Sequence, residues 1–214
     1  MLGIDVSPLQ PTVVPPNLTF RIQDASEEWI EQFDYIHMRD VAWIRDFPLI
    51  LEHAYNNLTP GGWIEFQEPN HSPSRSEYVL RTPSAMLTFW QTVGEGLKRM
   101  DTNLGNVEKL KDMLSDIGFV NVKEEVIEIP FGAWHENGEL NSIGRIYEEA
   151  WLQNLEGLAL RPLSKLDGWD QSSFKQFVER VRQMHKEPRA HKNECIQFYV
   201  VCGQKPEEES VEDG

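Results

Sequence analysis

Two short groups of polar and titratable residues each follow an apolar run in this chain. Residues 37–40 (HMRD) follow the run FDYI, and residues 68–70 (EPN) follow the run WIEFQ. If the two runs are neighbouring parallel strands, both groups lie at the carboxyl ends of the strands, where ligands of open α/β sheets bind. The alternative for each residue is an ordinary solvated loop position. Together, the two groups predict a ligand-binding crevice.

The segment around these groups predicts the elements that position them. Residues 33–38 are apolar or aromatic at most positions, which is typical of a buried strand in a parallel sheet. Apolar residues then recur at helical spacing from Pro48 to Leu58, and Asp46 is expected to cap this helix. Residues 59–62 (TPGG) end the helix, because proline cannot continue it and glycine accepts a positive φ. Strand, helix and strand at this spacing predict a right-handed βαβ crossover.

The remaining elements follow from periodicity and turn residues. We expect further strands at residues 1–5, 18–22, 119–129 and 195–202, and helices at 84–97, 106–117, 140–160 and 172–185. The chain of 214 residues is long enough to bury a core. We expect one domain over residues 1–204, followed by an acidic disordered tail at residues 205–214.

The composition excludes several classes of partner. The formal net charge is −15, and so acidic a surface repels phosphate backbones and anionic lipids, so we expect no direct nucleic-acid or membrane partner. The sequence has no membrane-length apolar run and no secretory signal pattern, which predicts a cytoplasmic or nuclear protein that is not secreted. Cys195 and Cys202 are expected to be free thiols on opposite faces of a strand, without a metal.

Several segments carry a resemblance to a known family. LTPGGWIEFQE resembles the helix-to-strand turn of class I methyltransferases that use S-adenosylmethionine, MLGID resembles their second strand, and IQDA their third. The fungal LaeA-like methyltransferases, a group that includes regulators of secondary metabolism, are similar in sequence to three segments of this chain: GIDVSPLQPTVVPPNLTFRIQDASEEW, FDYIHMRD and LTPGGWIEFQE. The resemblance is dense over residues 1–70 and thin beyond.

The resemblance implies a set of residues that bind S-adenosylmethionine. Asp5 would accept hydrogen bonds from the ribose hydroxyls, Asp24 would meet the adenine amino group, and Ala25 would offer its backbone N–H to a ring nitrogen. His37 and Arg39 would face the methionine end. The alternative for the two acids is an ordinary turn or cap position.

Methyl transfer from a sulfonium is an in-line displacement, so a base is needed only if the acceptor must lose a proton. His37, Glu68, His71 and His135 are therefore weak candidate bases, and each has a structural or solvated role as its alternative. The acceptor implied is a small molecule or a protein. The apolar stripe of the helix at 84–97 predicts core packing, with a lid over the acceptor pocket as the alternative.

One departure from the family pattern sets the fold prediction. In the family, the ribose-binding acid is preceded by a first strand, a glycine-rich loop of the type E/D-x-G-x-G-x-G and a helix, whereas this sequence opens on the second strand and is expected to hold no Gly-x-Gly. We predict an N-terminally truncated, Rossmann-like class I methyltransferase sheet. It lacks the first strand and the glycine-rich loop, and its last strand is antiparallel. Binding of S-adenosylmethionine should then be weak.

Three functional hypotheses follow. The first is a LaeA-like methyltransferase linked to fungal secondary metabolism, with a compromised cofactor site. The second is a non-catalytic regulatory or interaction protein derived from this fold, which would have a regulatory protein partner. The third is an incomplete gene model of an active methyltransferase.

Overall fold

The computed structural model describes residues 1–71, 84–186 and 194–208. Its strands are β1 (Leu2–Asp5), β2 (Thr19–Ile22), β3 (Phe33–Arg39), β4 (Leu58–Pro69), β5 (Val120–Pro130) and β6 (Cys195–Gln204). Its α-helices are α1 (Phe47–Asn57), α2 (Ala85–Lys98), α3 (Leu110–Ile117), α4 (Gly138–Leu163) and α5 (Gln171–Lys186), and the 3-10 helix η2 (Leu104–Lys109) leads into α3. The predicted strands and helices are all present, with small shifts of their ends.

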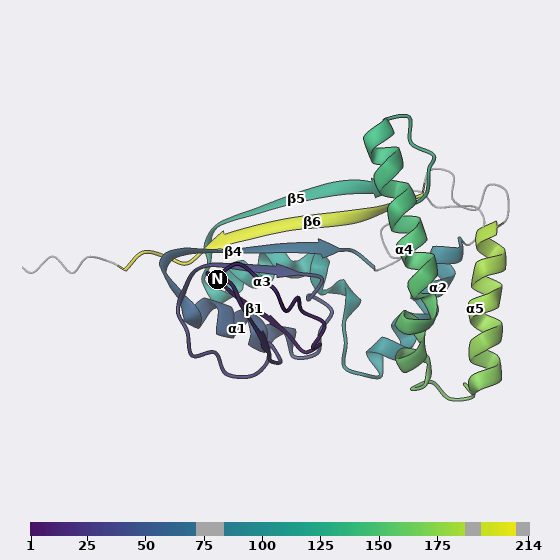
Figure 1. The fold of residues 1–214 in the computed structure, drawn as a ribbon, viewed down its shortest axis with the longest axis horizontal. Helices are drawn as coiled ribbons and strands as arrows, with labels where there is room; N and C mark the ends of the chain where they lie inside the picture. The colour runs from purple at the N-terminus through teal and green to yellow at the C-terminus, as the bar shows by residue number, and fades with distance from the viewer. Residues whose placement is uncertain (72–83, 187–193, 209–214) are drawn as a thin grey trace, which may run out of the picture.

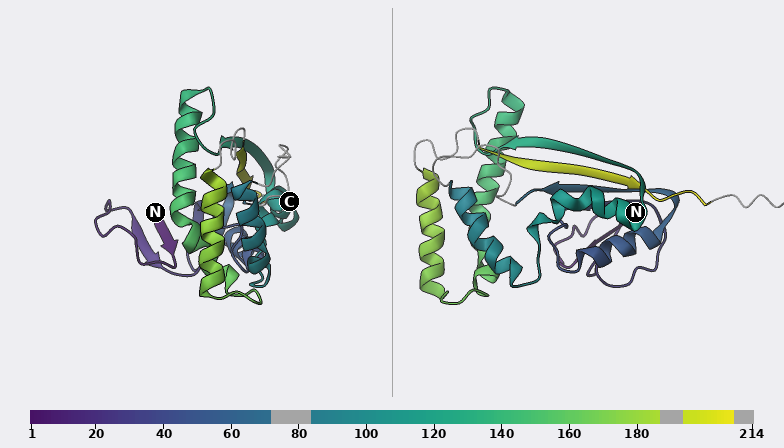
Figure 2. Two further views of the ribbon diagram at one scale, coloured as in Figure 1. Left: turned by 90° about the vertical axis from the view of Figure 1, so that its right-hand side faces the viewer. Right: turned by 180° about the vertical axis from the view of Figure 1, so that it is seen from behind.

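The strands form two separate sheets. β1 pairs with β2 in parallel, and the main sheet has the order β3-β4-β6-β5. β3 and β4 are parallel, whereas β6 runs antiparallel to both β4 and β5, between which it lies. The expected antiparallel last strand is therefore confirmed. In the described part of the chain no strand lies between β1 and β3, the place of the first strand in a class I methyltransferase, and Figure 2 shows the small sheet standing away from the main body.

Helices α1 and α3 cover one face of the main sheet (Figure 1). The core between them is built from Phe47, Ile50 and Leu51 of α1, Leu110 and Leu114 at α3, and the inward side chains of β3, β4 and β6: Ile36, Met38, Ile64, Phe66, Tyr199 and Val201. Burial alternates along β4, because successive side chains of a strand point to opposite faces. Over most of the opposite face, Figure 1 shows no helix.

A second apolar core lies at one end of the sheet, where α2, α4 and α5 pack together (Figure 1). Phe89 of α2 packs edge-on against Trp151 of α4, and Phe131, just after β5, packs against the same tryptophan. Ser84 caps α2 as predicted, since its hydroxyl accepts a hydrogen bond from Leu87 N. The apolar stripe of α2 is therefore core, as predicted, rather than an open lid.

Two local predictions are wrong. Asp46 precedes α1 but has a left-handed backbone (φ 61°) and makes no side-chain capping hydrogen bond; the helix instead begins next to Pro48, whose fixed φ suits a first turn. The sequence also does contain a Gly-x-Gly, at Gly94-Glu95-Gly96. It lies inside α2 and not in a loop after a strand, so it does not supply the cofactor-binding loop.

The expected tail begins with an ordered residue. Lys205 donates from its backbone to Gly62 O at 2.9 Å and from Nζ to Leu58 O at 2.7 Å, and its ammonium lies 5.2 Å from the ring centre of Tyr55. Residues 209–214 lie outside the described residues, as do 72–83 and 187–193.

The two glycines of α2 differ in a way that makes a matched test. A Cβ on Gly96 would lie 2.3 Å from Pro162 O of α4, whereas a Cβ on Gly94 would find its nearest neighbour at 3.6 Å. We predict that Gly96→Ala lowers the free energy of unfolding by about 1–3 kcal/mol through overpacking, while Gly94→Ala raises it by about 0.5–1 kcal/mol through helix propensity. Urea denaturation measures both, and an equal effect of the two substitutions would contradict the close contact.

Candidate functional site

A cavity of about 320 Å³ lies in the gap between the two sheets. It is bounded by β1 on one side, by β3 on the other, and by the segment that joins β2 to β3. Its lining comprises Leu2, Gly3, Ile4, Asp5, Gln23, Ala25, Trp29, Glu31, Phe33, Tyr35, Ile36, His37, Met38, Arg39, Val41 and Ile50. Three of these residues, Asp5, His37 and Arg39, lie at the carboxyl ends of β1 and β3, where open α/β sheets bind ligands.

Four of the five residues predicted to bind the cofactor line this cavity. They are Asp5 at the end of β1, Ala25 after β2, and His37 and Arg39 at the end of β3. Asp5 Oδ1 accepts a hydrogen bond from Ser7 N at 2.7 Å, which fixes the carboxylate at the strand end. His37 Nε2 lies 3.9 Å from Glu65 Oε1 on the neighbouring strand. The structure therefore brings these four residues to one site.

Asp24 is the exception among the predicted cofactor residues. Its Oδ1 accepts hydrogen bonds from Ser26 N at 2.9 Å and Ser26 Oγ at 2.8 Å, and it is absent from the cavity lining. These bonds, the backbone one first, hold the pKa of Asp24 below its usual value. Asp24 thus shapes the turn after β2 in this structure and does not face the cavity.

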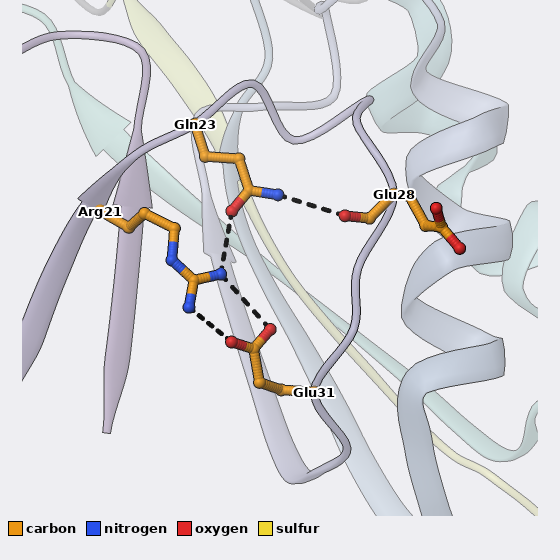
Figure 3. A network of polar contacts seen from close by, with 4 residues as sticks. All are labelled: Arg21, Gln23, Glu28 and Glu31. Carbon is orange, nitrogen blue, oxygen red and sulfur yellow. Dashed lines mark hydrogen bonds and ion pairs between the residues drawn. The ribbon is translucent and has the colours of Figure 1, made fainter.

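The small sheet is tied to the main body by a polar network (Figure 3). Arg21 of β2 donates to both carboxylate oxygens of Glu31 and, at 3.3 Å, to Gln23 Oε1, while Gln23 Nε2 donates to Glu28 O at 3.3 Å. The Arg21 and Glu31 side chains are partly exposed, so solvent screens their ion pair and it adds little to stability. Trp29 adds a firmer contact by packing against the main core.

Glu68 anchors the chain that leaves β3. Its side chain is fully buried, and its carboxylate accepts hydrogen bonds from Val41 N at 3.0 Å and Ala42 N at 3.1 Å. Burial, the main cause, raises the pKa of Glu68 to about 7, against the lowering effect of these two N–H donors. Because the carboxylate is enclosed, we assign Glu68 a structural role in holding the β3 loop beside β4.

A second group of side chains, which we call the aromatic dyad site, lies at the ends of β3 and β4. His71 Nε2 lies 3.5 Å from Asp40 Oδ1, and the His71 ring stacks on Trp90 of α2 with ring centres 4.4 Å apart. Trp43 Nε1 donates to the same Asp40 oxygen at 3.0 Å. In the part of the chain that the structure describes, His71 Nδ1 is buried without a hydrogen-bond partner.

The pKa values of two residues at the aromatic dyad site, Asp40 and Tyr147, are shifted. Burial would raise the pKa of Asp40, but the hydrogen bond and charge of His71 outweigh it, and the pKa is lower than usual. Burial, with a smaller effect of the Asp40 charge, raises the pKa of Tyr147 on α4. Asp40 itself has a left-handed backbone (φ 55°), an uncommon conformation for a residue with a side chain. Asp40 therefore remains the anionic partner of His71.

The other candidate base, His135, has a local role. Its Nδ1 accepts a hydrogen bond from Asn137 N at 3.0 Å, and its carbonyl accepts from Asn141 Nδ2 at 3.2 Å. His135 thus forms the turn before α4, whose first N–H groups are capped by Asn137. Sequence reasoning missed the aromatic partners Trp43 and Trp90, because nothing in their spacing shows that α2 passes beside the end of β4.

The parallel β3 and β4, the helices between and beside them and the antiparallel β6 are the features of a class I methyltransferase fold. The chain belongs to the methyltransferase domain family, whose pattern matches residues 1–124. In the described residues, no group of three or more potential metal ligands is present, and no helix combines the length and apolar character needed to cross a membrane.

The similar curated proteins are fungal. The chain is 29% identical over 190 residues to the secondary metabolism regulator LAE1 of Cochliobolus heterostrophus, covering 86% of this chain and 62% of that protein. It is 24% identical over 209 residues to the methyltransferase pytC of Aspergillus terreus, covering 96% and 64%. It is 29% identical over 203 residues to the probable methyltransferase tdiE of Emericella nidulans, covering 93% and 61%. The chain therefore spans less than two thirds of each of these relatives.

A solved structure, that of SpnF, has a similar fold. The [4+2]-cyclase SpnF matches with a TM-score of 0.52 at 16% identity, over 96% of this chain and 66% of that one. A phosphoethanolamine N-methyltransferase of Haemonchus contortus, solved with S-adenosylhomocysteine, matches with a TM-score of 0.47 at 18% identity, over 89% and 38%. At 16% identity, the likeness to SpnF shows the architecture alone.

The raised pKa of Glu68 predicts a pH-dependent stability. The folded chain keeps this proton up to about pH 7, whereas the unfolded chain releases it near 4.5, so the stability contributed by this residue falls as pH rises between these values. Glu68→Gln removes the titration, so we expect its free energy of unfolding relative to the parent to increase from pH 5 to pH 8 by on the order of 2 kcal/mol.

Urea titrations at several pH values test this, with Glu65→Gln as the control because Glu65 lies on the opposite face of β4 and is partly exposed. A relative stability of Glu68→Gln that does not change with pH would show that Glu68 is ionised in the folded state.

Proposed function

We propose that this chain is part of a LaeA-like, S-adenosylmethionine-dependent methyltransferase linked to fungal secondary metabolism, and that the chain as given holds only part of the cofactor site. The observation that carries the proposal is the convergence of Asp5, Ala25, His37 and Arg39 on one cavity at the carboxyl ends of β1 and β3. The proposal is also supported by similarity to curated proteins named as a secondary metabolism regulator and a methyltransferase.

The residues around the cavity fit one part of S-adenosylmethionine better than the other. The carboxylate of Asp5 suits the two ribose hydroxyls, and the partly buried Ala25 offers a backbone edge for the adenine. Arg39 supplies a cation for the carboxylate of the methionine part. No glycine-rich turn follows a strand beside Asp5 in the described residues, so close backbone contact with the methionine part is missing. When bound, the cofactor supplies an electrophilic methyl group.

The aromatic dyad site is the place we assign to the methyl acceptor. Asp40 Oδ1 orients the imidazole of His71, and an imidazole held by a carboxylate is suited to take a proton from an acceptor. The partly buried Trp43 lies beside it, and the buried Trp90 stacks on the His71 ring and holds it in place. These features favour a small molecule with a planar group and a dissociable proton, and a protein acceptor remains the alternative.

A non-catalytic regulatory protein is the second candidate function. The open gap between the two sheets favours it, because a chain that keeps the fold and leaves the cofactor site incomplete retains a surface for a partner. An incomplete gene model is the third explanation. Transcript sequence upstream of Met1 separates them, since an in-frame segment with a strand and a glycine-rich loop supports an active enzyme.

We predict that the purified chain binds S-adenosylmethionine more weakly than micromolar. The loss of several charge-assisted hydrogen bonds at about 1.5–3 kcal/mol each weakens binding by several powers of ten. Any residual affinity should fall further in Asp5→Asn and stay unchanged in Asp34→Asn, an exposed acid that does not line the cavity. Calorimetric titration measures this affinity. Micromolar binding, or binding that is unchanged in Asp5→Asn, would contradict the proposal that the chain holds only part of the cofactor site.

A further inference from the structure

Tyr147 of α4 forms one side of the aromatic dyad site. The residue is partly buried and packs on the second apolar core, as does Trp43, whose Nε1 donates to Asp40. Burial, and after it the charge of the nearby Asp40, raises the pKa of Tyr147, so the phenol keeps its proton. Within the residues that the structure describes, the Tyr147 hydroxyl makes no hydrogen bond. It can therefore donate one to a ligand at the aromatic dyad site.

Contacts on two sides of α4 fix how this helix is turned about its axis. Gly132 N, just after β5, donates to Gly144 O at 3.1 Å, and a Cβ on Gly144 would lie 2.4 Å from Gly132 O. On the side that faces α5, His185 Nε2 lies 3.0 Å from Glu148 Oε1. Figure 1 and Figure 2 show α5 on the far side of α4 from the main sheet. A residue of α4 that points away from α5 therefore points to the side of the strand ends.

Three exposed apolar residues adjoin Tyr147 on α4, and we call Ile143, Ile146 and Ala150 the apolar ledge. Residues three and four apart are neighbours on a helix surface, so Ile143 and Ala150 flank Tyr147, and Ile146 adjoins both of them. Ile143 is 43% exposed and Ile146 is 62% exposed. Glu148, which meets α5, follows Ile146 by two residues and so lies about 200° around the helix from it. The apolar ledge thus points away from α5.

The apolar ledge is continuous with a polar site, which distinguishes it from scattered surface residues. Single exposed apolar residues are common on any protein and need no ligand to explain them. Here the apolar surface is confined to one stripe, because the exposed residues on the next faces of the helix, Arg145 and Glu149, are charged. The stripe also begins beside the hydroxyl of Tyr147. A ligand that uses both surfaces must have a polar end and an apolar end.

We infer that the methyl acceptor is an amphiphilic small molecule, with a phenolic head at the aromatic dyad site and an apolar tail along the apolar ledge. The Tyr147 hydroxyl donates to the head oxygen. Asp40 Oδ1 holds His71 and Trp43, and Asp40 Oδ2 takes no part in those two contacts and can accept a hydroxyl of the head. The tail covers the ledge and removes apolar surface from water. That this ligand is a methyl acceptor rests on the proposed function, whereas its binding does not.

Two phenols that differ only in their tail test the site. The probe is hexylresorcinol, and its control is resorcinol, which has the same head and no tail. In calorimetric titration of the chain without cofactor, we expect saturable binding of the probe, at least about tenfold tighter than that of resorcinol. Equal affinity, or no binding of the probe, would overturn the inference. Because no cofactor is present, this result is independent of the S-adenosylmethionine titration that tests the proposed function.

Matched substitutions on α4 locate the head and the tail. Ile146 and Leu160 are 62% and 59% exposed, and they lie about 21 Å apart along the helix. Ile146→Asp should weaken probe binding by about tenfold or more and leave resorcinol unchanged, whereas Leu160→Asp should change neither. Tyr147→Phe keeps the ring that packs on Phe131 and should weaken both phenols alike.

Equal effects of the two aspartate variants would show that the alkyl chain binds without a specific site, and would overturn the inference. A Tyr147→Phe variant that binds both phenols as the parent does would also contradict it. Urea denaturation checks that each variant is folded. Ile146→Ser, which adds no charge, repeats the test of the apolar ledge if the aspartate variant is destabilised.

Discussion

The buried carboxylate of Glu68 is the interaction on which the architecture of the sites depends. Parallel pairing of β3 with β4 brings the two strand ends together, but pairing alone does not determine the path of the chain after β3. Glu68 does so by accepting the N–H groups of Val41 and Ala42. Asp40 is thereby held at the end of β3 in a left-handed conformation, within reach of His71. Glu68, one of the candidate bases predicted from the sequence, thus positions another candidate base, His71, through Asp40.

Much of the fold could be predicted because local patterns carry it. The run FDYIHM, the helical spacing before Leu58 and the helix-breaking residues TPGG predict a βαβ unit without any distant contact. TPGG does not form a separate turn, however, because it lies within β4. The antiparallel position of β6 came from the family resemblance and is confirmed. The N-cap of α1 was less predictable. Asp46 has a residue type that is common at N-caps, but its backbone is left-handed and its side chain makes no capping hydrogen bond.

The candidate site could be predicted only where its residues end a strand. Asp5, His37 and Arg39 were found that way, and they line one cavity. Asp24 has the same residue type and a similar place, yet Ser26, two residues on, takes its carboxylate for a turn. Trp90 could not be predicted as a neighbour of His71, because that contact depends on how α2 lies against the strand ends.

In the described part of the chain, the small sheet is paired separately from the main sheet. β1 and β2 keep parallel pairing, and the Arg21 network with the packed Trp29 keeps them near the main body. These contacts are few and partly exposed, so the small sheet is held less firmly than the main core. The cavity lies between the two sheets and is lined by both β1 and β3.

Gly96 sets the distance between α2 and α4 through backbone atoms, because Pro162 O occupies the space that a side chain would take. The spacing of these two helices is thus insensitive to the size of the apolar residues around it. Position 96 is therefore expected to stay glycine whatever residue stands at 162, whereas the side chains at the strand ends lie outside this contact. Diversification of the acceptor would then proceed through individual side chains at the strand ends, over a helical layer of constant geometry.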